Sequence, residues 1–284
     1  MTDSTPPIVS LLTDYGRDDE FVGVCHGVIL GIARDARIVD LSHEVPRHDV
    51  RRGAIVLRNA LPYIAADVHV AVVDPQVGSE RRALAVRCTD GTQLVGPDNG
   101  VLSLAWDRCG GVELAVDVTR SPYRLEPVSA TFHGRDLFTP VAAHLATGAE
   151  IAEAGEPVDP ETLDRIALPH PIFEEDGTVV AHVVTIDAYG NVALDLTHDQ
   201  LAGTGLMLGV TAEVAVDSSH GGAAVKLGGG RIAAPFVHTF ADVGPHEAIL
   251  YEDASRAVAI AINRGDAAAE LGLRPDDEVR LRPR

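Results

Sequence analysis

The sequence predicts an α/β N-terminal domain followed by a mainly β C-terminal domain. In the first half, apolar runs of strand length alternate with amphipathic stretches of helix length, which is typical of an α/β sheet with helices on both faces. After about residue 155 this alternation stops, and apolar segments separated by Gly and Asp follow. We therefore expect one domain over residues 1–168 and a second over 169–284.

The expected elements of the first domain follow from the spacing of apolar residues. Continuous apolar runs fit buried strands, whereas apolar residues three and four apart fit helices. Asp90-Gly91 separates two apolar runs and is a strong turn signal. The expected strands are 8–12, 37–41, 68–73, 82–87 and 93–95, and the expected helices are 21–33, 49–60 and 137–146.

Proline-rich segments precede the second domain. Residues 156–160 and 169–171 carry Pro at alternate or nearly alternate positions and are typical of a linker. The β-type segments beyond them are 178–186, 191–196, 207–216 and 231–236.

Composition and charge exclude several classes of protein. The chain has 284 residues, of which 46% are hydrophobic, so a sizeable core is available. Its 23 basic and 42 acidic residues give a net charge of −19, which would repel nucleic acid. A cationic small molecule is compatible with this charge, although solubility alone also explains it.

We expect the protein in a reducing cytoplasm. Residues 1–7 are polar and are not followed by a long apolar run, so they do not form a signal peptide. The sequence contains no apolar stretch long enough to span a bilayer. Cys25, Cys88 and Cys109 are widely spaced and odd in number, which argues against a disulfide framework and favours small buried residues.

Nucleotide-binding and metal motifs are absent from the sequence. The first strand is not followed by GxGxxG, and no phosphate loop ending in Gly-Lys-Ser/Thr or GxSxG elbow occurs. Neither a His-x-x-x-His nor a Cys-x-x-Cys pair suggests zinc, so a metal enzyme is not expected.

Asp14 and Asp74 are the first candidate site residues, because each follows a predicted strand. Ligands of open α/β sheets bind beyond the carboxyl ends of strands. After Asp74 a loop of small residues leads to Arg81 and Arg82, and an Asp–Arg pair across such a loop is a charge-assisted contact. An ordinary loop-anchoring ion pair gives the same pattern.

Two further groups have side chains suited to chemistry. His133 lies in Thr131-Phe132-His133-Gly134-Arg135-Asp136 and titrates near neutrality when unperturbed, although one His among 12 is weak evidence. Asp187 and Asn191 flank a Tyr-Gly turn and fit the binding of an ammonium and an amide-like ring edge, but both are also common turn residues.

Taken together, these segments resemble the S-adenosyl-L-methionine hydroxide adenosyltransferase family, relatives of the fluorinase and chlorinase. The matches run in order along nearly the whole chain, which makes the set specific although no single motif is decisive. The matching segments are Leu11-Leu12-Thr13-Asp14-Tyr15-Gly16, Asp40-Leu41-Ser42-His43, Val73-Asp74-Pro75, Gly96-Pro97-Asp98-Asn99-Gly100, Thr131-Phe132-His133-Gly134-Arg135-Asp136, Asp187-Ala188-Tyr189-Gly190-Asn191 and Ile262-Asn263-Arg264-Gly265.

The resemblance implies a Rossmann-like N-terminal domain and a β-barrel-like C-terminal domain. It also implies a homotrimer, in which the ligand lies between the N-terminal domain of one subunit and the C-terminal domain of its neighbour. The implied partners are the substrate S-adenosyl-L-methionine and other copies of the chain, with no cofactor, nucleic acid or membrane.

The family's catalytic Asp, Arg and His correspond to Asp74, Arg81 and His133, with Arg82 a close competitor for the middle role. The resemblance also implies residues that bind the substrate. Asp14 binds the ribose hydroxyls and Asp187 the methionine ammonium. Asn191 binds an adenine edge, Phe240 packs near the adenine ring, and Ser255 and Arg256 face the methionine end. His48 and Gly134 complete the expected binding set.

Three positions depart from the family pattern. Gln76 stands where the family usually has Gly, in the loop that holds Asp74. His48 stands where the halogenases carry a Trp over the ribose. The segment 253–256 matches poorly a stretch usually richer in Asn, Ser, Phe and Gly.

The function implied is hydrolysis of S-adenosyl-L-methionine to adenosine and L-methionine, by in-line attack of an activated water on the ribose C5′. A halogenase is the main alternative, but in halogenases a Tyr replaces the triad Asp, and the Asp74 carboxylate would repel a halide. A non-catalytic S-adenosyl-L-methionine or adenosine sensor would not need the three catalytic groups. A methyltransferase would need a glycine-rich first loop, which Thr13-Asp14-Tyr15-Gly16 is not.

Overall fold

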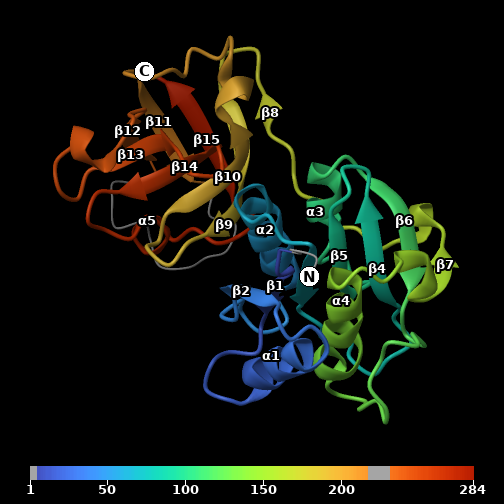
Figure 1. Cartoon of the computed structure of the whole chain (residues 1–284). Helices are drawn as coiled ribbons and strands as arrows, with labels where there is room; N and C mark the ends of the chain where they lie inside the picture. The colour runs from blue at the N-terminus through green and yellow to red at the C-terminus, as the bar shows by residue number, and fades with distance from the viewer. Residues whose placement is uncertain (1–4, 217–230) are drawn as a thin grey trace. The chain divides into compact units, whose positions relative to one another are not determined.

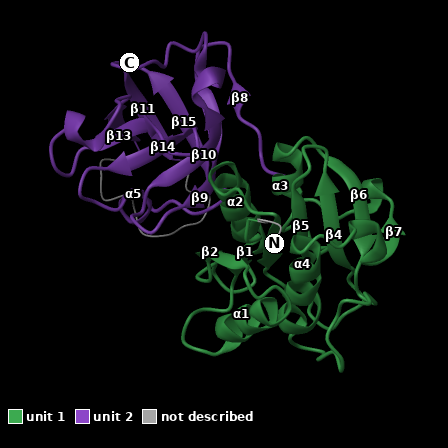
Figure 2. Cartoon of the chain, viewed as in Figure 1, with its two compact units in different colours: residues 1–166 green, residues 167–284 purple. Residues whose placement is uncertain are grey.

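The chain folds into two compact units, residues 1–166 and 167–284 (Figure 2). The structure, a computed structural model, describes residues 5–216 and 231–284. The boundary that we expect after residue 168 lies beside this division.

The first unit contains a mixed sheet in the order β2-β1-β3-β5-β4-β6-β7 (Figure 1). The strands β2, β1, β3 and β5 are parallel, whereas β4, β6 and β7 pair antiparallel with their neighbours. The strands are β1 (Ile8–Thr13), β2 (Arg37–Ser42), β3 (Val68–Val72), β4 (Ala83–Cys88), β5 (Gln93–Pro97), β6 (Val112–Asp117) and β7 (Glu156–Val158).

Helices cover both faces of this sheet, as the alternation of strands and helices predicts. The helices are α1 (Phe21–Ile32), α2 (Val50–Ala60), α3 (Ser103–Arg108) and α4 (Thr139–Ala146). Leu11 on β1 packs in one core with Ile29 of α1 and Val141 of α4. Leu12, the next residue, packs in a second core with Leu57 of α2 and Trp106 of α3. Successive strand residues point to opposite faces, so the sheet is buried on both sides.

The second unit is an antiparallel, barrel-like sheet in the order β12-β11-β15-β9-β10-β14-β13, with β8 paired to β9. Its elements are β8 (Ile172–Phe173), β9 (Val179–Ile186), β10 (Val192–Thr197), β11 (Thr211–Val216), β12 (Arg231–Pro235), β13 (Ala248–Glu252), β14 (Ala257–Ile262), β15 (Glu278–Pro283) and the helix α5 (Ala267–Leu271). A bridge between Phe236 and Leu250 joins the two ends of this order, which nearly closes the sheet. Phe236 is fully buried in the core that fills the barrel.

The predicted fold class is therefore confirmed, with one local difference. The helix expected over residues 137–146 begins as a π-helical turn over Gly134–Phe138 and becomes α-helical at Thr139. π-helical turns often occur at functional sites, and this one begins directly after His133.

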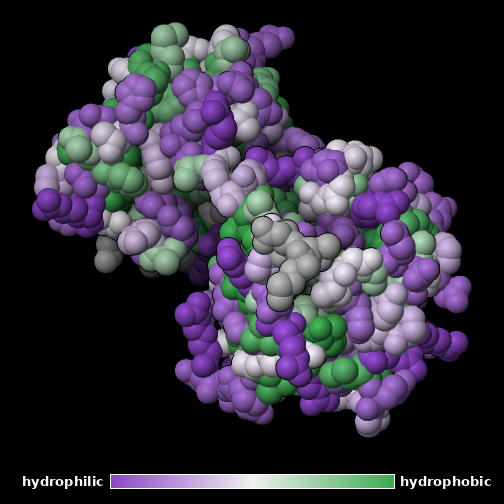
Figure 3. All heavy atoms as spheres, viewed as in Figure 1, coloured by the Kyte–Doolittle hydropathy of each residue, from purple (hydrophilic) through white to green (hydrophobic). Residues whose placement is uncertain are grey.

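Hydrophilic and hydrophobic residues are interspersed on the face of the molecule in Figure 3. Within the described residues, no helix has the length and apolar character needed to cross a membrane.

Candidate active site

Asp74 lies two residues beyond β3, in a loop that other segments hold in place. The side chain of Asn99 donates a hydrogen bond to the carbonyl oxygen of Val73 at 2.8 Å. Gly78 has φ of 80°, and a Cβ there would overlap the carbonyl oxygen of Ala130. Only glycine fits this backbone and this close approach, so the loop carrying Asp74 is fastened to the segment that leads to His133.

Arg81 joins Asp74 to His133. Its Nε lies 3.0 Å from Asp74 Oδ1 and 3.1 Å from Oδ2, and its Nη2 also donates to Oδ2. The same Nη2 lies 2.7 Å from His133 Nδ1. The guanidinium also packs over the Phe138 ring, 5.4 Å from its centroid. The three expected catalytic side chains thus form one hydrogen-bonded group.

Burial and charge determine the protonation state of His133. The Arg81 and Asp74 side chains are only 4% and 5% exposed, and His133 is 9% exposed. Burial, and then the positive charge of Arg81, lower the pKa of His133 below its usual value. A guanidinium only donates hydrogen bonds, so Nδ1 of His133 is the acceptor and the proton of the neutral ring lies on Nε2.

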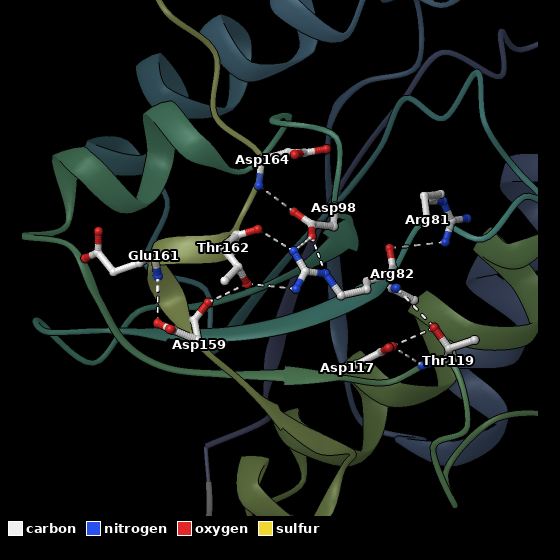
Figure 4. Close-up of polar contacts among 10 residues, drawn as sticks. Arg81, Arg82, Asp98, Asp117, Thr119, Asp159, Glu161, Thr162 and Asp164 are labelled. Carbon is white, nitrogen blue, oxygen red and sulfur yellow. Dashed lines mark hydrogen bonds and ion pairs between the residues drawn. The ribbon is translucent and has the colours of Figure 1, made fainter.

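Arg82 has different partners, which separates it from Arg81. It donates from Nε to Asp98 Oδ2 at 2.6 Å, and its Nη atoms reach the hydroxyl and the carbonyl oxygen of Thr162 (Figure 4). Asp98 also accepts from the backbone of Asp164 at 2.9 Å. Arg82 therefore anchors the start of β4 to the end of the first unit, and Arg81 is the arginine in contact with Asp74 and His133.

Gln76 does not disturb the loop. It is exposed, its φ is not positive, and its carbonyl oxygen accepts a hydrogen bond from the backbone of Ser79 at 3.0 Å. Glycine's conformational freedom is not needed here, so this departure from the family pattern leaves the position of Asp74 intact.

A cavity of about 320 Å³ opens beside Asp74 and His133. Asp14, His48 and Gly134, which the sequence predicts as binding residues, also line it. The backbone N–H of His48 donates to Asp14 Oδ2 at 2.9 Å, and His48 adopts φ of 67°. One oxygen of Asp14 is thereby fixed at the wall of the cavity.

Tyr15, Phe21 and Arg47 also line the cavity and were not among the predicted site residues. The ring of Tyr15 packs against Phe21 and Phe132 at centroid distances of 5.9 and 5.8 Å. Burial raises the pKa of Tyr15 well above its usual value, so its hydroxyl stays protonated. The signal for Tyr15 was its position directly after Asp14, whereas nothing in the local sequence marks Phe21 or Arg47.

In the second unit, Asp187 and Asn191 lie at the turn between β9 and β10. Asp187 accepts hydrogen bonds from the backbones of Tyr189 and Asn191, at 2.8 and 2.9 Å, and from the Asn191 side chain at 2.8 Å. These contacts show the turn-forming role of both residues, and the binding role stays a prediction.

The remaining predicted residues of this unit lie around β13. Phe240 packs against Tyr251, with 5.1 Å between ring centroids. Burial, and then the negative charges of Asp187 and Asp253, raise the pKa of Tyr251 to about 12. Sequence reasoning missed Tyr251, which lies inside a strand pattern and carries no motif.

Ser255 and Arg256 form the turn from β13 to β14. The backbone of Ser255 donates to Asp253 at 2.8 Å, and Arg256 adopts φ of 67°. Arg256 also lines a second cavity, of about 420 Å³, together with His198, Phe236 and Glu252. The turn is well formed despite the poor match of this segment to the family pattern.

Comparison with known proteins gives consistent results along the chain. Residues 9–155 match the SAM hydroxide adenosyltransferase N-terminal domain, and residues 181–280 match the C-terminal domain of that name. The chain is 46% identical over 275 residues to the (R)-S-adenosyl-L-methionine hydrolase of Salinispora tropica, covering 97% of each protein. It is 35% identical to the protein of that name from Thermus thermophilus, covering 96% of this chain and 98% of the relative.

The chain is also similar to a more distant relative and to a solved structure. A fluorinase from Actinopolyspora mzabensis is 24% identical, with 99% of each chain covered. The crystal structure of an uncharacterized conserved protein from Thermotoga maritima superimposes with a TM-score of 0.86 at 29% identity, covering 96% of this chain and 99% of that one. From these matches and its ordered motifs, this chain belongs to the SAM hydroxide adenosyltransferase family.

Proposed function

We propose that this protein hydrolyses S-adenosyl-L-methionine to adenosine and L-methionine. The observation that carries the proposal is the hydrogen-bonded group of Asp74, Arg81 and His133 at the edge of a cavity. It occurs in a chain 46% identical to a protein named (R)-S-adenosyl-L-methionine hydrolase.

The substrate supplies its own leaving group. When a water oxygen forms a bond to the ribose C5′, the C5′–S bond breaks and its electron pair goes to the sulfonium sulfur, which leaves as the neutral thioether of methionine. No acid is needed at sulfur, so we propose that the reaction uses no cofactor. The enzyme must hold the water in line with this bond, and positioning of this kind lowers a barrier by up to about 7–11 kcal/mol.

The protein groups have separate roles in handling this water. Arg81 fixes the Asp74 carboxylate by donating to both of its oxygens. His133 accepts from Arg81 through Nδ1, so its Nε2–H is a donor. Nδ1 of His133 already accepts a hydrogen bond from Arg81, and its Nε2 already carries a proton, so His133 has no nitrogen ready to take another. The Asp74 carboxylate has further lone pairs and takes the proton that the water loses. General-base catalysis of this kind typically contributes about 10²–10⁴-fold.

The other predicted residues bind the substrate. Asp14, with one oxygen held by the His48 backbone, accepts from the ribose hydroxyls, while His48 and Gly134 line the same cavity. Asp187 binds the methionine ammonium, Asn191 an adenine edge and Phe240 the adenine ring, and Ser255 and Arg256 face the methionine end. Support for the roles in the second unit comes from the family resemblance.

Water rather than halide is the nucleophile. The Asp74 carboxylate is anionic and would repel chloride or fluoride beside the reacting carbon. The relative named fluorinase is also more distant, at 24% identity against 46% for the hydrolase.

Chromatography of the products in ¹⁸O-labelled water tests the proposal. We expect adenosine carrying the label on its 5′ oxygen, methionine without the label, and the same rate after treatment with EDTA. Asp74→Asn, shown to be folded by circular dichroism at the assay temperature, reduces the rate by about 10²–10⁴-fold, whereas Asp90→Asn, in the exposed turn between β4 and β5, leaves it unchanged. A 5′-chloro product in chloride, S-adenosylhomocysteine with a methyl acceptor, or binding without turnover would each overturn it.

We also propose a homotrimer whose sites each take residues from two subunits. Co-expression of Asp74→Asn and Asp187→Ala chains tests this, since each chain alone is inactive. Random mixing restores about a quarter of the wild-type activity if neighbouring subunits share a site. Absence of any restoration in verified mixed oligomers contradicts the shared site.

A reducing cytoplasm is the location that we propose. Cys25, Cys88 and Cys109 are free and buried, which fits a compartment where thiols stay reduced. Cell fractionation with a cytoplasmic marker checks this.

A further inference from the structure

His26, Asp40 and His43 meet outside the cavity that contains Asp74. His26 comes from α1, Asp40 from β2, and His43 from the loop directly after β2. The Asp40 Oδ1 atom lies 2.9 Å from His26 Nε2 and 3.0 Å from His43 Nε2. The three donor atoms all lie within 4.8 Å of one another.

His43 is held like a preoriented metal ligand. Its side chain is 1% exposed, and its Nδ1 lies 2.8 Å from the hydroxyl of Thr13. Its Nε2 is buried and faces Asp40 Oδ1 at 3.0 Å, without forming a well-aligned hydrogen bond to a described residue. A histidine fixed at one nitrogen by a neighbour, with the other nitrogen turned toward further ligand atoms, is typical of metal-ligating histidines.

We propose that His26 Nε2, His43 Nε2 and Asp40 Oδ1 bind one divalent transition-metal ion, zinc being the ion best suited to them. Two imidazoles and one carboxylate are ligands that zinc accepts, with water in the remaining position. Metal bonds of about 2.0–2.2 Å in a tetrahedron place ligand atoms roughly 3.3 Å apart. The two contacts of Asp40, at 2.9 and 3.0 Å, need to lengthen by only a few tenths of an ångström, and the two histidine nitrogens already lie within 4.8 Å of each other.

Access to the site is open on one side. The side chains of His26 and Asp40 are 30% and 33% exposed, so an ion and its water ligand can enter without unfolding. Sequence patterns give no sign of this site, because its three donors come from a helix, a strand and a loop rather than from one spaced motif.

The proposed ligand His43 is also attached to the segment that carries Asp14, by contacts that do not need the metal. Thr13 contacts the His43 ring, and the backbone N–H of Gly16 donates to the His43 carbonyl oxygen at 2.8 Å. Asp14 lies between these two attachment points. The site is nonetheless separate from the proposed chemistry, which uses none of the three ligands.

The test is a zinc titration of the metal-free full-length protein against a chromophoric chelator. We expect the wild type to bind one more zinc ion per chain than His26→Ala or Asp40→Asn, both of which change partly exposed side chains. Thr13→Val, which keeps the shape but removes the hydroxyl, weakens this ion's affinity by about 10–100-fold. Cobalt substitution gives the visible absorption of a four- or five-coordinate ion in the wild type, and neither His26→Ala nor Asp40→Asn gives it.

A matched control removes a histidine that contacts a single aspartate and, in the part of the chain that the structure describes, no third potential metal ligand. His182 lies 2.8 Å from Asp195 and belongs to no such three-donor group among the described residues. His182→Ala therefore binds zinc like the wild type. Equal zinc stoichiometry in the wild type and His26→Ala, with both folded by circular dichroism, overturns the proposal and leaves a hydrogen-bonded cluster in its place.

Discussion

Arg81 determines the state of both side chains that it contacts. Its guanidinium donates to Asp74 and to His133 from a position only 4% exposed, where charges act strongly on one another. The positive charge opposes protonation of His133 and so lowers its pKa. A lysine could not contact both residues with the same planar geometry.

The pKa of His133 is open to direct measurement. NMR titration of the imidazole should show a pKa below the usual 6.5, and Arg81→Met should raise it because the opposing charge is gone. The unfolded chain binds this proton at higher pH than the folded chain, so the associated stability is lost as the pH falls below about 6.5. A wild-type value at or above 6.5 would contradict the assignment of a neutral, Nε2-protonated ring.

Gly134 is required by the residue packed on it. A Cβ at this position would overlap the Tyr15 hydroxyl in the cavity wall. We expect Gly134→Ala to lower kcat/KM by about 10²-fold, because the ring and the neighbouring His133 must move. Adding Tyr15→Phe removes the clashing oxygen and restores part of the loss.

The control for this experiment is Gly27→Ala, in α1, where a Cβ would have open space. It leaves kcat/KM unchanged. If the double variant is no better than Gly134→Ala alone, the Tyr15 contact is not the reason for the glycine.

At the scale of elements, the motif 96–100 supports the loop that carries Asp74. Asn99 fixes the end of β3 through the Val73 carbonyl oxygen, and Asp98 fixes the start of β4 through Arg82. Both ends of the loop from Asp74 to Arg81 are thus held from the end of β5. The motif helps to identify the family, yet its Asn and Asp make structural contacts.

Arg82→Met tests this support. Removal of the Arg82 guanidinium leaves the Asp98 carboxylate, which is 4% exposed, without its charged partner. The free energy of unfolding in urea should therefore fall by about 1–3 kcal/mol. The folded variant keeps its turnover rate because Arg82 does not contact Asp74 or His133.

Arg87→Met is the matched control on the same strand. Arg87 pairs with Glu113 at the surface, where both side chains are at least one-third exposed, so the change should stay below about 1 kcal/mol. A larger effect of Arg87→Met than of Arg82→Met would refute the anchoring role.

Sequence reasoning about these elements succeeds where a local pattern suffices. The runs around 8–12 and 68–73 form the parallel strands β1 and β3, because continuous apolar character specifies a buried strand. The choice between Arg81 and Arg82 could not be made this way. The two residues are adjacent and chemically identical, and partners 7 and 16 positions away decide their roles.

At the scale of the whole molecule, the fold class follows from the change in pattern along the chain. Alternating strands and helices require a sheet covered on both faces, and short β segments without helices favour a barrel or sandwich. What the sequence did not reveal depends on tertiary contact. Tyr251 joins the Phe240 neighbourhood through packing, and the cluster of His26, Asp40 and His43 forms only when three segments fold together.

The burial of Arg81 constrains any attempt to redesign this enzyme for halide chemistry. Exchanging Asp74 alone for a neutral residue would leave a guanidinium almost completely enclosed and without a counter-charge. Stranding one member of a buried ion pair typically costs about 3–5 kcal/mol. A library aimed at a new nucleophile should therefore vary positions 74 and 81 jointly, so that each tested anion site starts from a balanced charge.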